Sequence, residues 1–360
     1  MTKLSRRGIL SAVAASAVAS PAVAQSMPNL KWRMTTSWPK SLDLTYGVCE
    51  ELAKYVAELT DGRFQIQVFA GGEIVPPLAA TDATSNGTVE MCHTATYYNY
   101  GKDPTWALFC AIPFGLNARM QNAWMYDAGG MDVMNEFTRK FNIHSLAGGN
   151  TGCQMGGWFR NELKDVASLK GLKFRVGGFA GTVLAKLGVV PQQIPASDIY
   201  PALERGTIDA AEWVGPHDDE KLGFYKVAKF YYTPGWWEGG TVLHYLTNLD
   251  KWESLPRNYK AALTAAAAFA NSLLIARFDS QNPIALKRLL ANGTQLRSFS
   301  PAIMSACLKA ANDVYAETSA QNADFKKVWD NIKAFRNMEY EWWQVAEFNY
   351  DNFMVRTAAR

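Results

Sequence analysis

The sequence is poor in the residue types on which most catalytic and metal-binding motifs depend. Its 360 residues include four histidines and five cysteines. The histidines have no metal-ligand spacing, and no GxSxG, HExxH, P-loop or protein-kinase signature occurs. These absences argue against the common hydrolases, metalloproteases and nucleotide-dependent enzymes, and against a metal scavenger. They leave open a catalytic group that is assembled from distant positions in the chain.

The cysteines do not predict a disulfide framework. Their number is odd, and their spacing fits neither a CxxC pair nor a zinc site. All of them stand in apolar surroundings: Cys49, Cys92, Cys110, Cys153 and Cys307. We therefore expect buried free thiols.

Long hydrophobic runs are missing except near the N-terminus. The stretch SRRGIL, from Ser5 to Leu10, is similar to a twin-arginine export signal. An apolar run follows it and leads to Ala22-Val23-Ala24, which suits signal peptidase. We expect residues 1–24 to be a twin-arginine signal peptide, so that the mature chain resides in the periplasm. No later stretch looks long and apolar enough for a membrane helix.

A strong excess of charge is missing as well. The chain carries 36 Lys and Arg against 33 Asp and Glu, a formal net charge of +3 at pH 7. Lys3, Arg6 and Arg7 belong to the expected signal peptide, so the mature chain is close to neutral. The basic excess therefore does not indicate a nucleic-acid partner.

What the chain does contain is a repeated α/β pattern. Hydrophobic residues make up 48% of the sequence, which is ample for a buried core and suggests two lobes. Strand-like and helix-like segments alternate from Leu30 to His93, and a glycine-rich stretch at residues 148–158 is the expected crossing into a second lobe. A β-α-β-α-β unit follows between Ser168 and Pro216. Parallel strands of this kind bind ligands beyond their carboxyl ends, and Arg175 and Glu212 are both expected near such ends.

The same stretch resembles the signature region of the solute-binding proteins of TRAP (tripartite ATP-independent periplasmic) transporters. It reads LKGLKFRVGG, then LAKLGVVPQQIP, then YPALERGTIDAAE, in matching order and spacing. Weaker matches extend from Trp32 to the C-terminal region. The resemblance implies a periplasmic-binding-protein-like α/β fold, in which two lobes close on a ligand by a hinge motion. It also implies a long kinked helix that spans both lobes, and extra C-terminal helices.

The element pattern places the lobes along the chain. Residues 27–152 and 241–282 are expected in lobe I, residues 153–240 and 283–337 in lobe II, and residues 338–360 in a C-terminal helix. The candidate for the spanning helix starts after Pro256 and ends at Ala291, with a break or kink at Asn282-Pro283. Residues His217 to Glu220 are expected to form a solvated helix start.

Arg175 is the leading candidate for binding the ligand. From its spacing alone, a strand-end salt bridge explains it equally well, but it stands in the LKGLKFR motif, where the family has its carboxylate-binding arginine. A second candidate segment, residues 96–100, offers hydroxyls and aromatic rings directly after a strand. Its tyrosines have packing as the alternative role. The expected substrate-binding residues are Arg175, Gln154, Thr96, Tyr97, Tyr98, Asn99 and Tyr100.

A departure from the usual family pattern narrows the expected ligand. The chain reads DAAEW up to Trp213, where most members continue DGxEN, and it has Trp-Trp-Glu ending at Glu238. These features resemble the branch of the family that binds 2-oxo acids with a cation. A 2-oxo acid offers two oxygens in a five-membered chelate, which a hard cation accepts. The expected cation ligands are Glu212, Glu238, Gln154 and the Trp213 carbonyl, with sodium as the implied ion and calcium as the alternative. Loop salt bridges are the other role open to the two glutamates.

Together these features predict the extracytoplasmic solute-binding subunit of a TRAP transporter. The expected ligand is a 2-oxo monocarboxylic acid such as pyruvate, bound with a metal cation and delivered to separate membrane permease subunits. The alternatives are a binding protein for another organic acid, or a periplasmic hydrolase or lyase that uses Glu212 or Glu238 as its base.

The C-terminal stretch predicts an assembly. Residues 338–359 keep apolar side chains at helical spacing: Trp342, Trp343, Ala346, Phe348, Tyr350, Phe353 and Met354. Two complete lobes do not require this face, and a soluble monomer rarely exposes so large a patch. We expect a homodimer that exchanges the C-terminal helix across a two-fold axis. The alternative is a tail that folds back over its own lobes.

Overall fold

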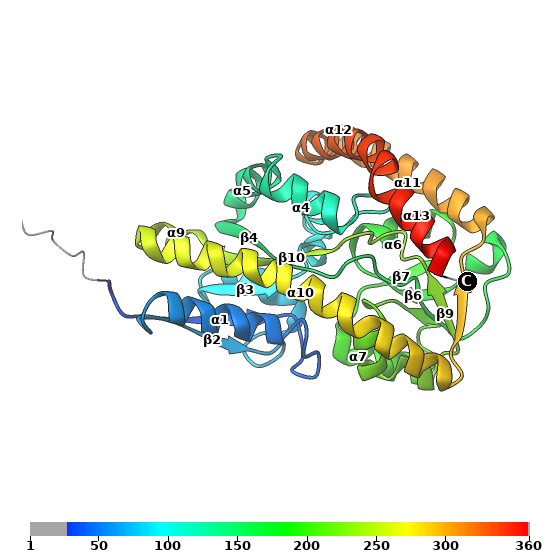
Figure 1. Ribbon diagram of the computed structural model, residues 1–360, viewed down its shortest axis with the longest axis horizontal. Coiled ribbons are helices and arrows are strands. Elements are labelled where there is room, and N and C mark those ends of the chain that lie inside the picture. Colours follow the sequence, from blue (N-terminus) through cyan, green and yellow to red (C-terminus); the bar gives the residue numbers. More distant parts are fainter. Residues whose placement is uncertain (1–26, 359–360) are drawn as a thin grey trace, which may run out of the picture.

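Two β-sheets organise the chain in the computed structural model, which describes residues 27–358 (Figure 1). The first sheet has the order β2-β1-β3-β10-β4, and the second has the order β11-β9-β5-β8-β6-β7. Each sheet mixes parallel and antiparallel pairs, and helices pack around both. The expected two-lobe α/β fold is confirmed. The expected signal peptide lies outside the described residues, and the cleavage and export that it predicts stay predictions.

Lobe I is built on the first sheet. Its strands are β1 (Leu30–Thr36), β2 (Phe64–Phe69), β3 (Met91–Thr94), β4 (Ile143–Asn150) and β10 (Val242–Asn248). Its helices are α1 (Gly47–Leu59), α2 (Ala80–Ser85), α3 (Thr105–Leu108), α4 (Ala118–Tyr126), α5 (Gly130–Thr138) and α9 (Leu249–Ser254). Helix α1 shows why these segments fold as they do: Val48, Leu52 and Val56 recur at helical spacing, and all three are fully buried.

Lobe II is built on the second sheet. Its strands are β5 (Gly157–Phe159), β6 (Lys173–Arg175), β7 (Val190–Gln192), β8 (Ala210–Ala211), β9 (Phe230–Thr233) and β11 (Gln295–Ser298). Its helices are α6 (Gly178–Lys186), α7 (Ala196–Glu204) and α8 (Pro216–Leu222). Strands β6, β7 and β8 run parallel, so their carboxyl ends meet at one edge of the sheet.

One long helix, α10 (Arg257–Ala291), runs along both lobes (Figure 1). It packs against α1 and β4 in lobe I and against α8 in lobe II. The expected break at Pro283 is absent, and the helix continues through it. Phe278, Ala285 and Leu289 are buried on either side of Pro283, and this packing outweighs the hydrogen bond that a proline removes.

Helix α10 is also long and apolar enough to meet the length and composition of a membrane span, contrary to the expectation from the sequence. Its position explains the composition, because its apolar and alanine-rich face packs against α1, β4 and α8. This is the arrangement of a core helix.

Three further helices, α11 (Pro301–Gln321), α12 (Ala323–Val345) and α13 (Glu347–Ala358), form the C-terminal part. Helix α11 packs on α6 of lobe II, whereas α12 packs on α3 and α4 of lobe I. The lobe division expected from the sequence therefore remains a proposal, with α12 moved out of lobe II. The expected single helix over residues 338–360 is wrong, because α12 runs to Val345 and the chain turns at Ala346 before α13.

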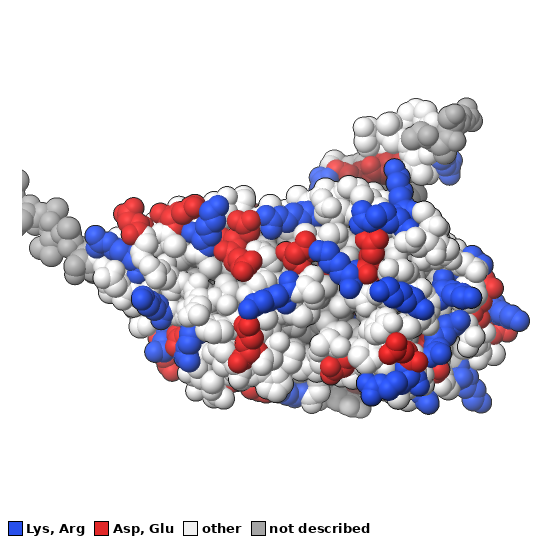
Figure 2. All heavy atoms as spheres, turned by 90° about the horizontal axis from the view of Figure 1, so that it is seen from below, with Lys and Arg blue, Asp and Glu red and all other residues white. Residues whose placement is uncertain are grey.

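The C-terminal tail projects from the body of the molecule, at the upper right of Figure 2. Its base is fixed where Glu347 forms an ion pair with Arg119 of α4. Figure 2 also shows basic and acidic side chains interspersed over the rest of this face.

Four of the five cysteines are buried, as expected, and all five, which lie within residues 27–358, are free thiols. Cys153 differs because it is exposed. It stands in the crossing between β4 and β5, which runs outside both sheets.

The start of α8 also differs from its expected solvated state. Asp218 and Asp219 are fully buried. Asp219 accepts hydrogen bonds from Trp158 Nε1 at 2.9 Å and Tyr231 Oη at 2.7 Å. These donors come from β5 and β9, so the local sequence gave no sign of them.

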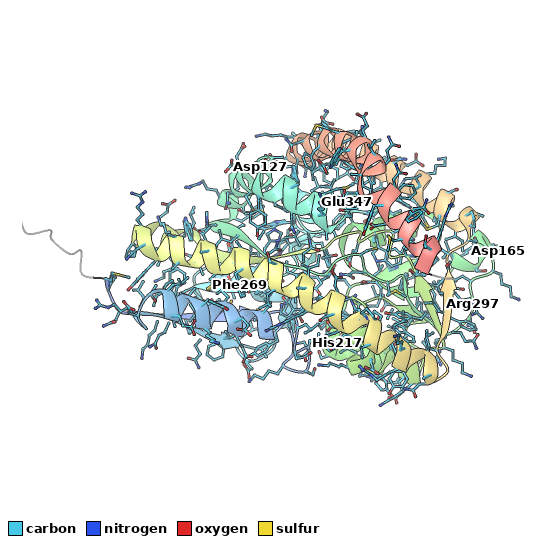
Figure 3. The ribbon with its side chains drawn as sticks, viewed as in Figure 1. Asp127, Asp165, His217, Phe269, Arg297 and Glu347 are labelled. Atoms are coloured by element: carbon cyan, nitrogen blue, oxygen red, sulfur yellow. The ribbon has the colours of Figure 1, made fainter. Side chains whose placement is uncertain are left out.

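Charged side chains link the two lobes beside α10. Asp43, which precedes α1, pairs with His217 Nε2 at 3.0 Å and with Lys221, both on α8. Figure 3 labels His217. Partial burial works to raise the pKa of Asp43, but hydrogen bonds from Lys221 and His217 outweigh it and hold the pKa below its ordinary value. These pairs exist only while the lobes are together, so they favour the closed form.

Replacing Asp43 by Asn should shift the lobes toward the open form. A partly exposed pair contributes about 0.2–1 kcal/mol, so the open population should rise by no more than about fivefold. Small-angle X-ray scattering should then give a larger radius of gyration than for the unchanged protein. Asp313→Asn is the matched control, because its partner Lys309 lies on the same helix. An equal radius of gyration for Asp43→Asn and the control would contradict the claim that the ion pairs of Asp43 favour the closed form.

Candidate functional site

Arg175 and Glu212 meet at the carboxyl edge of the second sheet. Arg175 ends β6, Glu212 follows β8, and the two strands are parallel neighbours with Arg175 opposite Ala211. Both side chains are fully buried. Arg175 Nη1 donates to the Glu212 carbonyl at 2.6 Å and to Glu212 Oε1, which also accepts from the Gly177 amide at 3.2 Å. The pair that the sequence placed at these strand ends is therefore formed.

The remaining nitrogens of Arg175 have unequal surroundings. Nε donates to the Ile194 carbonyl at 3.2 Å, and the guanidinium carbon lies 4.9 Å from the centre of the Trp213 ring. Nη2 is buried and has no hydrogen-bond partner among residues 27–358. Arg175 thus presents one available donor, not the two-pronged fork expected from its chemistry.

Two loops cross between the lobes and supply further polar groups: residues 151–156 between β4 and β5, and residues 234–241 between β9 and β10. The Gln154 amide donates to the Glu238 carbonyl at 3.0 Å, and the Gly235 amide donates to the Gln154 carbonyl at 2.9 Å. A Cβ at Gly235 would come within 2.6 Å of the Gln154 carbonyl oxygen, so only glycine permits this approach. The Gln154 side chain donates from Nε2 to Thr151 and Thr241, each at 3.1 Å. The Thr151 hydroxyl donates to the Gly152 carbonyl at 3.1 Å, which leaves its oxygen to accept from the Gln154 side-chain amide nitrogen.

Three buried oxygens around Arg175 lack partners in the described part of the chain: Gln154 Oε1, Glu212 Oε2 and Glu238 Oε2. Burial raises the pKa of Glu212 to about 7 against the lowering effect of Arg175. Burial and the neighbouring Glu212 raise the pKa of Glu238 well above its ordinary value. Two acids therefore share one buried arginine, and the cluster is short of positive charge.

This donor set fits a hard cation. Carboxylate and amide oxygens are the ligands that sodium-like and calcium-like ions accept, and here they are buried without competing bonds. Trp213 follows Glu212 directly in the chain, and its carbonyl stays a predicted ligand. Within residues 27–358 no group of three His, Cys, Asp or Glu side chains has metal-site geometry. The arrangement with two glutamates and one glutamine therefore differs from a transition-metal site.

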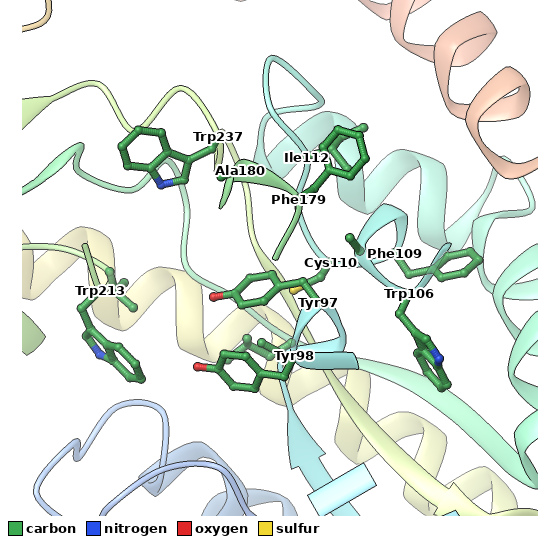
Figure 4. Close-up of a cluster of buried hydrophobic side chains, with 14 of the residues drawn as sticks. Tyr97, Tyr98, Trp106, Phe109, Cys110, Ile112, Phe179, Ala180, Trp213 and Trp237 are labelled. Atoms are coloured by element: carbon green, nitrogen blue, oxygen red, sulfur yellow. The ribbon is translucent and has the colours of Figure 1, made fainter. Parts of the chain in front are cut away.

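Only part of the segment 96–100 contributes to the candidate site. Residues 96–99 form a 3-10 turn after β3, and Tyr97 and Tyr98 pack edge to face with ring centres 5.0 Å apart. Figure 4 shows their hydroxyls pointing to the same side, toward Trp213 and Trp237. Gly177 and Gly178 allow this approach, because a Cβ on Gly178 would lie 2.6 Å from Tyr97 Cβ.

The other residues of this segment use their polar atoms elsewhere or stay enclosed. Asn99 Nδ2 donates to Thr81 Oγ1 at 2.9 Å, and Tyr100 Oη accepts from Thr182 Oγ1 of lobe II at 3.0 Å. Thr96 is fully buried and does not line the cavity described next. We keep Tyr97 and Tyr98 as ligand-binding candidates.

A small cavity lies between the lobes at this cluster. The space in it that a water-sized sphere can occupy is about 10 Å³, enough for about one water molecule, so a ligand enters only when the lobes part or the lining shifts. Arg175, Glu212 and Glu238 do not line it. The lining residues are Trp38, Thr45, Tyr97, Tyr98, Thr151, Gln154, Trp213, Val214, Thr241 and Leu243. The sequence did not point to six of them: Trp38, Thr45, Thr151, Val214, Thr241 and Leu243. The position of Trp38 just after β1 was the available signal, since β1 is parallel to β3 and ends at the same edge.

The known proteins to which the chain is similar are periplasmic solute-binding proteins. The chain is 49% identical, over 92% of its own length and 91% of the relative, to the monocarboxylate 2-oxoacid-binding periplasmic protein of Nostoc sp.. It is also 49% identical to a TRAP transporter solute-binding protein from Bordetella bronchiseptica, whose crystal structure is a dimer with calcium and picolinate in one site. The TM-score is 0.91, and the match covers 92% of this chain and 99% of the other.

A second solved structure, a TRAP periplasmic solute-binding protein from Pseudoalteromonas atlantica, contains sodium and pyruvate. It is 37% identical with a TM-score of 0.88, over 90% of this chain and 99% of the other.

The family comparison covers most of the chain. Residues 34–322 match the family described as bacterial extracellular solute-binding protein, family 7. This range includes the second sheet, all of the first sheet except residues 30–33 of β1, the two crossings and every residue of the charged cluster. The chain therefore belongs to family 7 of the bacterial extracellular solute-binding proteins, the ligand receptors of TRAP transporters.

Proposed function

We propose that the chain binds a short 2-oxo monocarboxylate such as pyruvate, together with sodium or calcium, and delivers it to the membrane permease of a TRAP transporter. The observation that carries the proposal is the buried cluster of Arg175, Glu212 and Glu238, in which one arginine nitrogen and one oxygen of each glutamate have no partner among residues 27–358. The unpartnered side-chain oxygen of Gln154 belongs to the residue whose backbone amide bonds the Glu238 carbonyl. This arrangement matches a cation and an anionic oxygen ligand bound together. The named relatives with pyruvate or picolinate support the same chemistry.

Each residue of the cluster has a distinct task in this proposal. Arg175 Nη2 donates to one carboxylate oxygen of the ligand, while Nε and Nη1 hold the guanidinium in place. Glu212, Glu238 and Gln154, with the Trp213 carbonyl, hold the cation. The cation supplies a positive centre for the keto oxygen and the second carboxylate oxygen. Tyr97 and Tyr98 enclose the ligand from lobe I and exclude water from the polar contacts.

The charges explain why ligand and cation belong together. Two buried glutamates near an anionic ligand repel it in surroundings of low dielectric constant, and a cation between them reverses the effect. Calcium makes the cluster and a monocarboxylate neutral as a whole, whereas sodium leaves one negative charge. Both ions occur in the related structures.

Of the two alternative functions raised by the sequence, the enzyme is excluded and another organic acid is kept as a second candidate ligand. As a member of this family, the chain is a receptor and not an enzyme, so the hydrolase or lyase is set aside. Another organic acid stays possible as a second candidate because picolinate, a pyridine carboxylate, occupies the site of one relative. Picolinate and pyruvate share a carboxylate beside a second donor atom, which is the feature that a cation chelates.

Native mass spectrometry of the protein purified from its periplasmic fraction tests the proposal. We expect a bound mass equal to one cation plus one 2-oxo acid, and the same acid should be recovered unchanged after incubation. A co-purified ligand without a carboxylate next to a second donor would contradict the proposed function.

Removal of either glutamate charge should release the cation. Glu212→Gln and Glu238→Gln each take one anionic oxygen ligand from a buried site, so we expect metal content to fall below half of one ion per chain by elemental analysis. Glu162→Gln is the control, because Glu162 pairs with Arg297 at the surface. Full occupancy in both site variants would remove the two glutamates from the cation site.

Arg175→Lys should weaken binding of the 2-oxo acid by about tenfold or more, because at least one charged hydrogen bond worth about 1.5–3 kcal/mol is lost. Calorimetry with pyruvate in excess cation measures the change. Arg297→Lys, an exposed substitution on β11, serves as the control. A change below about threefold would exclude Arg175 from ligand binding.

The C-terminal tail supports the proposed homodimer. Side chains along α12 and α13 remain largely exposed in the single chain: Met338, Tyr340, Trp342, Val345, Phe348, Tyr350, Phe353, Met354 and Val355. A tail that covered its own lobes would bury this face. A second copy of the chain covers it by exchange of α13, and the Bordetella bronchiseptica relative is a dimer.

Truncation before Met338 should convert the dimer into a monomer that still binds its ligand. The removed segment carries the exposed apolar face, while every residue of the charged cluster precedes it. Light scattering at micromolar concentration, compared with the full chain, gives the mass. A full-length monomer would contradict the exchange, and a truncated dimer would place the interface elsewhere.

A further inference from the structure

The cavity between the lobes is lined by both polar and apolar side chains. Gln154 Nε2 donates to the hydroxyls of Thr151 and Thr241, so these three polar groups lie together. Trp38, Val214 and Leu243 supply apolar surface to the same lining. A 2-oxo acid held through its oxygens by the cation cluster would place its carbon chain against these apolar groups, because hydrocarbon gains most where polar groups are absent.

Trp38 is the largest of these groups, and it is held in place. Its indole Nε1 donates to His93 Nδ1 at 2.8 Å, and His93 Nε2 donates to the Gly148 carbonyl at 3.2 Å. Burial lowers the pKa of His93 to about 3, so the ring is neutral at pH 7 and its Nδ1 is free to accept. Gly148 itself is tightly packed, because a Cβ there would lie 2.0 Å from the Tyr245 ring.

Neighbouring rings close off the other directions in which Trp38 could turn. The Trp213 ring stands edge-on at 6.2 Å between centres, and the Tyr98 ring lies 6.3 Å away. Trp38 is 3% exposed. The indole therefore forms a rigid wall, and the chain cannot enlarge the cavity by a simple rotation of this side chain.

We propose that Trp38, held by His93, limits the length and branching of the carbon chain of the 2-oxo acid. This inference rests on the proposed function, since it concerns the same ligand. His93 acts as a positioning residue through Trp38 and does not contact the ligand. The substrate class is thereby narrowed to 2-oxo acids with a short, unbranched side chain.

The test compares the dissociation constants of pyruvate and 4-methyl-2-oxopentanoate by calorimetry in excess calcium. A Trp38→Leu variant should change the ratio of the two constants by at least about tenfold in favour of the branched acid, since each buried methylene alters affinity roughly fourfold. Leu243→Ala removes apolar lining that β10 supplies to the same cavity, and it should shift the ratio of dissociation constants in the same direction. If Trp38→Leu does not fold, Leu243→Ala still tests the size limit.

Three further variants separate a size limit set by Trp38 from a general loosening of lobe I. Trp32→Leu truncates a buried tryptophan that packs on Phe64 away from the cavity, and it should leave the ratio unchanged. His93→Leu removes the acceptor that holds the Trp38 indole, so the ratio of dissociation constants should shift in favour of the branched acid while residue 38 stays a tryptophan. His93→Gln keeps an acceptor and a donor and should restore the ratio.

The outcomes distinguish the two proposals. Pyruvate binding with a ratio within about threefold of the unchanged protein, in both Trp38→Leu and Leu243→Ala, would overturn the size limit and leave the proposed function intact. No binding of either acid by the unchanged protein would overturn the proposed function, and the size limit with it.

Discussion

A shortage of positive charge between the lobes is the constraint on which the rest of the structure depends. Glu212 and Glu238 are buried within reach of one arginine, and the remaining carboxylate oxygens have no partner among residues 27–358. Such a cluster is costly in the absence of a counter-ion, because desolvation penalises each uncompensated charge. Because this cost is relieved when a cation and an anionic ligand bind together, the cluster favours that combination over either one alone. The fold tolerates the cluster because the rest of both lobes is well packed.

The position of the cluster links binding to the motion of the lobes. Arg175 and Glu212 belong to lobe II, Tyr97 and Tyr98 to lobe I, and Gln154 and Glu238 to the two crossing segments. Contacts such as Gln193 Nε2 with the Tyr98 carbonyl, at 3.2 Å, exist only when the lobes meet. A ligand that bridges these groups therefore stabilises the closed form by its differential affinity for it. The long helix α10 packs against both lobes, and the two crossings are the segments at which we expect the chain to bend.

Much of the fold and part of the site were predictable from the sequence. The LKGLKFR motif located Arg175, and the strand pattern placed Glu212 beside it, because adjacent parallel strands end at one edge. Gln154 and Glu238 were placed by resemblance, and the structure brings both to the same cluster. Trp38 and Thr241 were missed, since they come from segments whose proximity is set by the packing of whole lobes.

The errors have local physical causes. Five consecutive residues, 96–100, were expected to face the ligand, but a 3-10 turn directs successive side chains about 120° apart, so only Tyr97 and Tyr98 of the five line the cavity. Asp219 was expected in solvent, but Trp158 and Tyr231 supply donors that stabilise it when buried. A break or kink was expected at Pro283 in the long helix, and the helix continues through it without a break because buried residues on both sides sustain it. In each instance tertiary packing outweighed a local preference.

Titration of pyruvate into protein stripped of metal by a chelator, with and without added sodium or calcium, tests the central claim most directly. The account predicts that heat of binding is detectable only after a cation is restored, and that affinity rises with cation concentration because the two ligands share one charged cluster. Equal affinity for pyruvate in the stripped and the restored protein would contradict it.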